Sequence, residues 1–249
     1  MMERCFESAG RGTLMDIKID SSVKRLIPNC RLGVLAIRGI TVRGTPPALA
    51  EELALLQAKV AATYRLDALT SGPNMDKFKP IRRKTDWDAG QCRPAPEPLV
   101  RRLLQNKGNA YVNTAVDVVS YCSLKYLLPF GLYDLDRISG DVLYKLFPEN
   151  CISQEEFGFG IADNSCSADM DKEIPYLTDA AGPFGTPAVD STRTAVTLTT
   201  RNVLIVLYAD TEYADEQLEE MLGFAGQMFV RYNRGSIAEK KIVAGCNEK

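Results

Sequence analysis

The stretch that most constrains the fold runs from residue 113 to residue 141, NTAVDVVSYCSLKYLLPFGLYDLDRISGD. Apolar side chains recur in its first half at helical spacing, which predicts an amphipathic helix over residues 112–127. Pro129 and Gly131 are expected to end that helix, and an apolar strand is expected from Val142 to Phe147. Four polar side chains therefore surround one junction of helix, loop and strand: Asn113, Asp117, Asp134 and Asp136.

The polar residues of this junction have two interpretations. Asp117 and Asp134 are candidate catalytic carboxylates, because a carboxylate can move a proton or hold an ammonium group. The alternative is structural: Asn113 stands where a helix cap is expected, and aspartates in turns commonly accept hydrogen bonds from backbone N–H groups. The two roles are not exclusive, since an aspartate that fixes a loop also shapes a pocket.

The rest of the chain predicts an α+β fold. Helical patterns cover residues 48–66, 98–107 and 213–230, and strand patterns cover residues 14–19, 30–40 and 202–208. We expect a β-sandwich-like core of mixed strands with surrounding helices. The domain is expected to span residues 15–233, as one unit or as two tightly packed lobes. Residues 1–14 are predicted to be a loose tail, and residues 234–249 a C-terminal tail.

The chain contains no histidine. This excludes Ser-His-Asp and Cys-His catalysis, histidine-ligated zinc and imidazole acid–base chemistry. Proton transfer must use carboxylates, Lys, Tyr, Cys, water or the substrate itself. The acidic run at residues 162–173 lacks the Asp-x-Asp-x-Asp-Gly pattern of a calcium loop, so we predict no metal and no cofactor.

Seven cysteines are present, and none forms a C-x-x-C pair. Reduced thiols and a cytoplasmic location fit this pattern. Cys30 and Cys122 lie in apolar patterns and are expected in the core, so a cysteine-based enzyme is the weakest functional hypothesis. No run of eighteen apolar residues occurs, so no membrane-spanning helix is expected.

Charge is unevenly distributed along the chain. Residues 1–110 hold 19 Lys and Arg against 11 Asp and Glu, whereas residues 111–249 hold 11 against 21. Basic residues next to Phe78 and Trp87 suit an RNA backbone and a stacked base, although a solvated surface loop would have the same composition. The candidate RNA-binding residues are Lys77, Lys79, Arg82, Arg83, Lys84, Arg101 and Arg102.

The order of the central residues resembles a known family. An Asn-x-x-x-Asp helix is followed by Ser-Leu and then by Leu-Pro-x-Gly-x-x-Asp-Leu-Asp-x-Ile-x-Gly-Asp, which is similar to the B3/B4 domain. That domain is best known as the tRNA-editing domain of the phenylalanyl-tRNA synthetase β subunit, and it also occurs in free-standing proteins. The resemblance covers most of residues 20–230 and implies the same α+β fold.

The resemblance also implies a substrate site. The Gly-rich segment AAGPFGT, residues 180–186, is similar to one wall of the editing pocket, where glycine lets a substrate approach the backbone. Two departures are visible: Gly131 stands where the synthetase has a histidine, and Val206 stands where it has a glutamate. The candidate substrate-binding residues are Asn113, Asp117, Gly131, Tyr133, Asp134, Gly182, Gly185, Asp190 and Arg193.

Two functional hypotheses follow. The first is a deacylase that acts in trans on aminoacyl-tRNA, since hydrolysis of an activated ester can depend on positioning and backbone donors without a histidine base. The second is a non-catalytic module that binds tRNA or a small amino-acid-like ligand after losing the editing residues. The expected partner is tRNA or aminoacyl-tRNA, with no membrane and no DNA involved.

Overall fold

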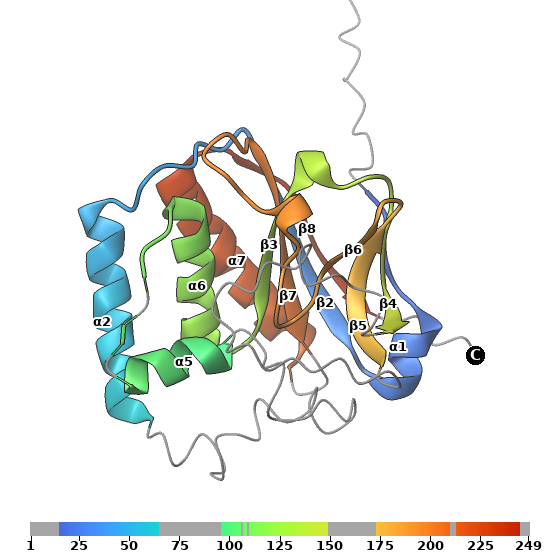
Figure 1. Ribbon diagram of the computed structural model, residues 1–249, viewed down its shortest axis with the longest axis horizontal. Coiled ribbons are helices and arrows are strands. Elements are labelled where there is room, and N and C mark those ends of the chain that lie inside the picture. Colours follow the sequence, from blue (N-terminus) through green and yellow to red (C-terminus); the bar gives the residue numbers. More distant parts are fainter. Residues whose placement is uncertain are drawn as a thin grey trace, which may run out of the picture.

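Two β-sheets and a layer of helices form the fold seen in the computed structural model (Figure 1). The structure describes residues 15–64, 96–105, 107–108, 110–148, 173–209 and 213–244. Within these ranges each sheet has four strands. The helices cover one face of the first sheet, and the second sheet packs against its other face (Figure 1). The predicted α+β class and the sandwich of mixed strands are confirmed.

The first sheet is antiparallel throughout and has the strand order β3-β7-β2-β8. Its strands are β3 (Phe130–Asp134), β7 (Asn202–Ala209), β2 (Arg31–Arg38) and β8 (Ser236–Ala244). The runs LGVLAI in β2 and VLIVLYA in β7 are buried on both faces. Continuous apolar runs of this kind are typical of strands enclosed between two layers.

The second sheet has the order β1-β4-β5-β6. It consists of β1 (Ile17–Ile19), β4 (Val142–Pro148), β5 (Glu173–Asp179) and β6 (Gly182–Gly185). The pair β1–β4 is parallel, and the other two pairs are antiparallel. The short helix α1 (Ser21–Leu26) follows β1 and is capped by Asp20.

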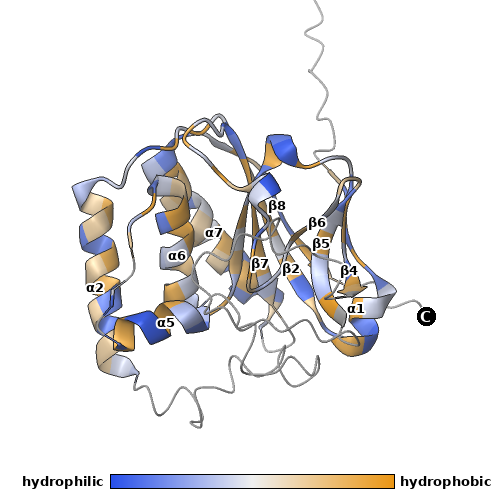
Figure 2. Ribbon diagram, viewed as in Figure 1, coloured by the Kyte–Doolittle hydropathy of each residue, from blue (hydrophilic) through white to orange (hydrophobic). Residues whose placement is uncertain are grey.

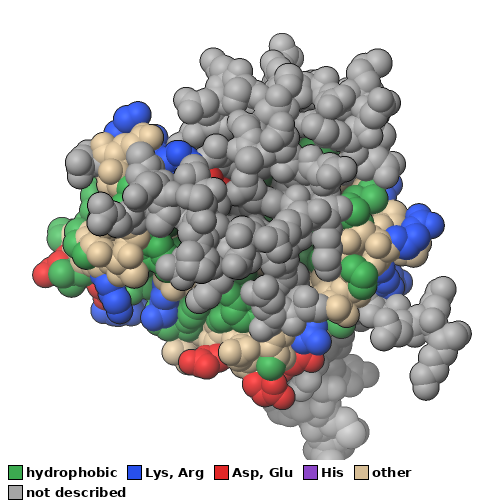
Figure 3. All heavy atoms as spheres, turned by 90° about the horizontal axis from the view of Figure 1, so that it is seen from below, with side chains coloured by type: hydrophobic (Ala, Val, Ile, Leu, Met, Phe, Trp, Pro, Cys, Tyr) green, Lys and Arg blue, Asp and Glu red, His purple; other side chains and the backbone are tan. Residues whose placement is uncertain are grey.

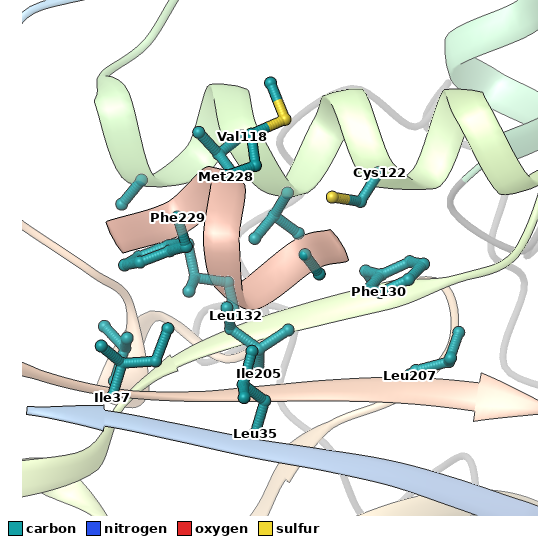
Figure 4. Close-up of a cluster of buried hydrophobic side chains, with 14 of the residues drawn as sticks. Leu35, Ile37, Val118, Cys122, Phe130, Leu132, Ile205, Leu207, Met228 and Phe229 are labelled. Carbon is teal, nitrogen blue, oxygen red and sulfur yellow. The ribbon is translucent and has the colours of Figure 1, made fainter. Parts of the chain in front are cut away.

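Four helices lie on one side of the first sheet in the described part of the chain: α2 (Pro47–Thr63), α5 (Pro96–Leu104), α6 (Thr114–Tyr126) and α7 (Asp215–Asn233). Of these, α6 and α7 contact the strands, and α2 and α5 pack against α6. The hydropathy colouring shows polar and apolar residues alternating along them (Figure 2). Val118 and Cys122 of α6 and Phe229 of α7 point toward the sheet side chains Leu35, Leu132 and Ile205 (Figure 4). This cluster is the larger part of the apolar core.

A second apolar cluster lies between the two sheets. It contains every second side chain of the strands in the first sheet, because neighbouring side chains of a strand point to opposite faces. Leu204, Val206 and Tyr208 of β7 face the second sheet, whereas Ile205 and Leu207 face the helices. Tyr133, Tyr144 and Phe184 complete the aromatic part of this cluster. The aromatic part contains the buried polar groups on which the candidate site depends.

Two expectations from the sequence are wrong. Residues 130–134 form β3 instead of a loop, because each of these residues pairs with β7. Residues 236–244 form β8 instead of a tail, because they pair with β2 along the whole of that strand. Both strands lie at the edges of the first sheet, so each of them pairs with only one neighbouring strand.

Candidate functional site

Asn113 and Asp117 fix the start of α6. The side chain of Asn113 is the helix cap, and its Oδ1 accepts hydrogen bonds from the N–H groups of Ala115 and Val116, both at 3.0 Å. Asp117 is buried and accepts from the N–H of Val112 at 3.0 Å through Oδ1, and from the hydroxyl of Thr45 through Oδ2. Both side chains are therefore engaged in the local framework.

Asp134 ends β3 and caps the short 3-10 helix η2 (Leu135–Arg137). Its Oδ1 accepts from the N–H of Asp136 at 3.1 Å, and its Oδ2 accepts from the hydroxyl of Thr200 at 2.6 Å. The guanidinium of Arg137 lies 3.8 Å from the same Oδ2. The partners of Asp134 and those of Asp117 share no residue, so the structure does not bring the two predicted carboxylates into one hydrogen-bonded group.

Arg193 is paired with Asp179, a residue that the sequence did not single out. Two guanidinium nitrogens of Arg193 donate to the two carboxylate oxygens of Asp179, at 2.9 and 3.0 Å. Burial favours a higher pKa for Asp179, but Arg193 and the N–H groups of Ser139 and Ala181 outweigh it and lower that pKa. Arg193 also donates to the carbonyl of Gly182 at 3.3 Å. The ion pair thus fixes the turn between β5 and β6.

The Gly-rich segment, residues 180–186, begins with a turn at residues 180 and 181 and continues as a strand. Gly182–Gly185 form β6, which pairs with β5 and leads into a tight loop of residues 186–189. The hydroxyl of Thr186 holds this loop by accepting from the N–H groups of Ala188 and Val189, at 3.0 and 2.8 Å. Asp190 then pairs back with Gly185 as an isolated bridge. The loop therefore sets the position of Asp190.

The phenol of Tyr133 lies between Gly131 and Gly185, two glycines from different sheets. A Cβ added at Gly131 would lie 2.7 Å from Cζ of Tyr133, and one added at Gly185 would lie 2.6 Å from its Cε1. These separations are shorter than any real contact of a Cβ atom. Three of the predicted substrate-binding residues are thus brought together, and the tyrosine itself fills the room that the glycines leave.

Tyr133 and Tyr208 form a hydrogen-bonded pair beside these glycines, and Asp190 lies next to this pair. The hydroxyls of Tyr133 and Tyr208 are 2.7 Å apart. The carboxyl group of Asp190 is near enough to the Tyr133 hydroxyl and to the N–H of Leu132 for both groups to influence its pKa. The tyrosines belong to β3 and β7 of the first sheet, and Asp190 belongs to the segment that follows β6.

Of these three side chains, Asp190 is the one whose pKa lies near neutral pH. Its removal from bulk water raises its pKa to about 7, even though the hydrogen bonds from Tyr133 and Leu132 favour the ionised form. Burial, the largest cause, also raises the pKa of both Tyr133 and Tyr208 well above 10, so both phenols stay protonated. The residue Asp190 remains partly exposed to solvent. It is thus a carboxyl group that exchanges a proton near neutral pH.

The predicted RNA-binding residues are only partly within the described chain. Lys77, Lys79, Arg82, Arg83 and Lys84 lie outside the described residues. Arg101 and Arg102 are on α5 and are half-buried. Arg101 donates to the buried Glu97 at 3.2 Å, and Arg102 donates to the carbonyl of Gly108 at 3.3 Å. On the described part of the face in Figure 3, basic side chains lie at several separate places.

Sequence reasoning did not identify Tyr208, Thr200 or Asp179, although each is bonded to a predicted site residue. Tyr208 sits in an apolar strand run, so nothing in its sequence surroundings marks its hydroxyl as a partner. Among the described residues, no group of three or more Cys, Asp or Glu side chains is placed to hold a metal ion. No described helix has the length and apolar character needed to cross a membrane.

Comparison with known proteins identifies a family and a solved structure to which this chain is similar. Residues 88–247, more than half of the chain, match the family described as the B3/4 domain. An N-terminal fragment of the phenylalanyl-tRNA synthetase β-subunit from Pyrococcus horikoshii is similar at 15% sequence identity and a TM-score of 0.39. That match covers 92% of this chain and 50% of the fragment, so the chain spans about half the length of the solved structure. A search of curated proteins gives no match.

Proposed function

This chain belongs to the B3/4 domain family, and we propose that it hydrolyses the ester bond of aminoacyl-tRNA in trans, with the carboxyl group of Asp190 as the proton acceptor. The observation that carries the proposal is the position of Asp190. Its carboxyl group lies beside the Tyr133 hydroxyl and the N–H of Leu132, next to the edge strands of the two sheets, and the residue remains partly exposed to solvent. In a chain without histidine, such a carboxyl group is the best available base.

The reaction requires little from the protein besides a base and a positioned water. The water oxygen attacks the ester carbonyl carbon while its proton passes to the Asp190 carboxylate. The tetrahedral intermediate then loses the ribose oxygen, which takes that proton and leaves as a free hydroxyl group. Amino acid and uncharged tRNA are the products. Tyr133 and Leu132 hold the carboxylate in place through both steps, which is the positioning that makes an intramolecular base effective.

The remaining predicted residues support the site without entering the reaction. Asp117 and Asp134 hold the start of α6 and the end of β3 through their hydrogen bonds, and both are buried, whereas Asp190 is partly exposed to solvent. We therefore assign the proton transfer to Asp190 in preference to these two. We propose that the basic residues of 77–84 together with Arg101 and Arg102 contact the tRNA backbone, because phosphate contacts supply most of the affinity for RNA. We also propose a cytoplasmic location, with which seven cysteines that form no C-x-x-C pair are in keeping.

A non-catalytic binding module is the second candidate. The observation that favours it is that Asp117 and Asp134 accept hydrogen bonds from neighbouring residues and Arg193 is paired with Asp179, so all three side chains are engaged within the protein itself. Such a module would bind tRNA or an amino-acid-like ligand and leave the ester intact. The two candidates therefore differ in one measurable product, the free amino acid.

The test is deacylation of a panel of cognate and mischarged aminoacyl-tRNAs by the wild-type protein and by Asp190→Asn. The matched control is Asp136→Asn, an aspartate of the same region whose partner is Asn202. We expect the wild-type protein and the control to hydrolyse at least one ester, and Asp190→Asn to be slower by about 100-fold or more. Binding of tRNA without hydrolysis would establish the binding module. Full activity of Asp190→Asn would remove Asp190 from the reaction.

A further inference from the structure

A group of arginines lies at one end of the first sheet. The loop after β2, the loop before β7, η2 and the turn between α7 and β8 lie together at the upper end of the view in Figure 1. These segments are residues 38–46, 195–202, 135–138 and 231–236, which contain no lysine and one acidic residue, Asp136. The same segments contain six arginines, which we call the arginine end: Arg38, Arg43, Arg137, Arg201, Arg231 and Arg234.

Strand pairing holds three members of the arginine end close together. In the register of the first sheet, Arg38 lies opposite Asn202 on one side and opposite Ser236 on the other. Arg201 directly precedes Asn202 in the chain. Arg234 lies two residues before Ser236. The positions of these arginines are therefore fixed by the pairing of β2, β7 and β8.

The arginine end continues to the segment of the candidate site. The guanidinium group of Arg137 donates to the backbone carbonyl of Arg193 at 3.3 Å, and that of Arg193 donates to the carbonyl of Arg137 at 3.2 Å. Arg193 belongs to the short 3-10 helix η4 (Thr192–Thr194), which begins two residues after Asp190. A polyanion bound along the arginine end would thus pass next to the segment that contains Asp190.

Most of the charge of the arginine end is available to a ligand. Arg38 and Arg234 are exposed, and within the described chain their side chains form no hydrogen bond or ion pair. Arg43 and Arg201 are also exposed, and in the described part of the chain they donate to backbone carbonyl groups instead of carboxylates. The other two members are close to carboxylates. Four guanidinium groups are therefore not neutralised by the described residues.

The loop before β7 adds hydroxyl groups to this surface. The hydroxyl of Thr200 donates to Asp134 at 2.6 Å and accepts from the N–H of Thr197 at 3.0 Å, which fixes the loop. Thr197 and Thr199 are exposed next to it. Hydroxyl groups beside guanidinium groups are further donors for phosphate oxygens. The surface thus combines the two kinds of side-chain donor that bind a nucleic-acid backbone.

We propose that the arginine end binds the sugar–phosphate backbone of tRNA beside the Asp190 segment. This inference rests on the proposed function, from which it takes tRNA as the ligand. The planar guanidinium group binds a phosphate through two hydrogen bonds and stacks on unpaired bases. Anionic lipids attract lysine and arginine alike, so a surface that uses arginine alone favours RNA over a membrane.

The arginine end is distinct from the RNA contacts predicted from the sequence. Arg101 and Arg102 belong to α5, which packs against the C-terminal end of α6. Arg43 lies at the other end of that helix, since its N–H donates to the hydroxyl of Thr114 at 3.1 Å. The two sets of arginines are therefore separated by the length of α6, and variants can distinguish them.

The test measures affinity for uncharged tRNA, a readout that requires no hydrolysis. The variant combines Arg38→Gln with Arg234→Gln, two changes that break no hydrogen bond or ion pair within the described chain. We expect tRNA to bind at least about 10-fold more weakly. The slope of log affinity against log salt concentration should fall by about 1 for each arginine removed. Arg38→Gln alone should show about half of this decrease in slope, so it decides if the double variant does not fold.

The matched control combines Lys24→Gln with Arg25→Gln, which removes the same charge from α1 at the lower end of the view in Figure 1. The control should bind tRNA within about 2-fold of the wild-type protein. Equal losses in the variant and the control would show a response to net charge alone and would overturn the inference. Unchanged affinity and salt slope in the double variant would overturn it as well.

The remaining outcomes separate this inference from the proposed function. Binding of phosphatidylglycerol vesicles without binding of tRNA would assign the arginine end to a membrane surface and overturn the inference. Binding of tRNA that depends on Arg38 and Arg234, without hydrolysis of any ester, would support the inference and overturn the proposed function. Hydrolysis with an unchanged KM in the double variant would support the proposed function and overturn the inference.

Discussion

Gly131 and Tyr133, two residues apart on the same face of β3, are in direct contact, with the phenol of the second covering the Cα of the first. The ring cannot retreat, because Gly185 closes its other side and Tyr208 holds its hydroxyl. The same contact therefore contributes both to the packing between the two sheets and to the shape of the candidate site.

Gly131→Ala is expected to destabilise the protein by about 1–3 kcal/mol, which is the usual cost of overpacking a filled core. The free energy of unfolding in urea measures it. In a Tyr133→Ala background the same change should cost clearly less, because the atoms that collide with the new Cβ are gone. Equal costs in both backgrounds would contradict the contact.

The matched control is Gly223→Ala on α7, where an added Cβ meets nothing within 4 Å. Alanine favours a helix over glycine by about 1 kcal/mol, so this variant should be as stable as wild type or slightly more stable. A loss of stability at both glycines would indicate a general intolerance of added methyl groups instead of a specific contact with Tyr133.

The raised pKa of Asp190 predicts how stability depends on pH. The unfolded carboxyl group has a pKa of about 3.9, whereas the folded one has a pKa of about 7. The folded protein therefore binds the extra proton, and the stability that this proton contributes is present below about pH 4 and is lost as pH rises to about 7. The wild-type protein should be more stable at pH 5 than at pH 8 relative to Asp190→Asn.

Urea unfolding of both proteins at pH 5, 6, 7 and 8 tests this prediction. Subtracting the free energy of unfolding of the variant from that of the wild type removes the contributions of the other titrating groups. Asp179 is one of them, and its lowered pKa changes the stability with pH in the opposite direction. A difference that does not change between pH 5 and pH 8 would show that Asp190 titrates as an ordinary surface aspartate.

Arg193→Ala is expected to destabilise the protein because it leaves the carboxylate of Asp179 buried without its cation. The Asp179 side chain has no exposed surface, whereas Arg193 is 30% exposed and partly screened by solvent, so we expect a loss of about 2 kcal/mol. Thermal unfolding at pH 7 measures it. Lys18→Ala, which removes an exposed ion pair with Asp16, should leave the midpoint unchanged. Similar midpoints for the two variants would contradict a special role of the Asp179 pair.

Removal of β8 is expected to prevent stable folding. A chain that ends at Gly235 lacks the strand that pairs with β2 from Arg31 to Arg38, so it exposes the edge of a strongly apolar strand and should aggregate. A chain that ends at Ala244 keeps β8 and is the control. Light scattering and far-UV circular dichroism distinguish the two. A monomeric, folded product of the shorter chain would show that β8 is dispensable.

The strands and helices with a strong apolar pattern could be predicted from the sequence. β2 and β7 are long apolar runs, and α6 and α7 have clear helical periodicity, so their burial dominates their structure. β3 was missed because Pro129 and Gly131 are typical of turns, and β8 because SIAEKKIVA is rich in charge. Both strands depend on pairing with residues distant in the chain, a tertiary effect that no local pattern contains.

The candidate site was predictable as a set of residues but not as an arrangement. Asp117, Asp134 and Asp190 are alike as aspartates in a sequence, and only the fold shows that the first two are buried while the third remains partly exposed to solvent. The placement of Tyr133 over Gly131 depends on the second sheet, which is far away along the chain. Side-chain direction between two layers cannot be obtained from residue order alone.

The most direct measurement of the role of Asp190 is the dependence of kcat/KM on pH for the best aminoacyl-tRNA substrate, corrected for uncatalysed hydrolysis. A base must be ionised to accept a proton, so we expect kcat/KM to rise as Asp190 loses its proton near pH 7 and then to level off. Asp190→Asn should abolish that rise together with most of the activity. A flat profile, or the same rise in the variant, would contradict the assignment of Asp190 as the proton acceptor.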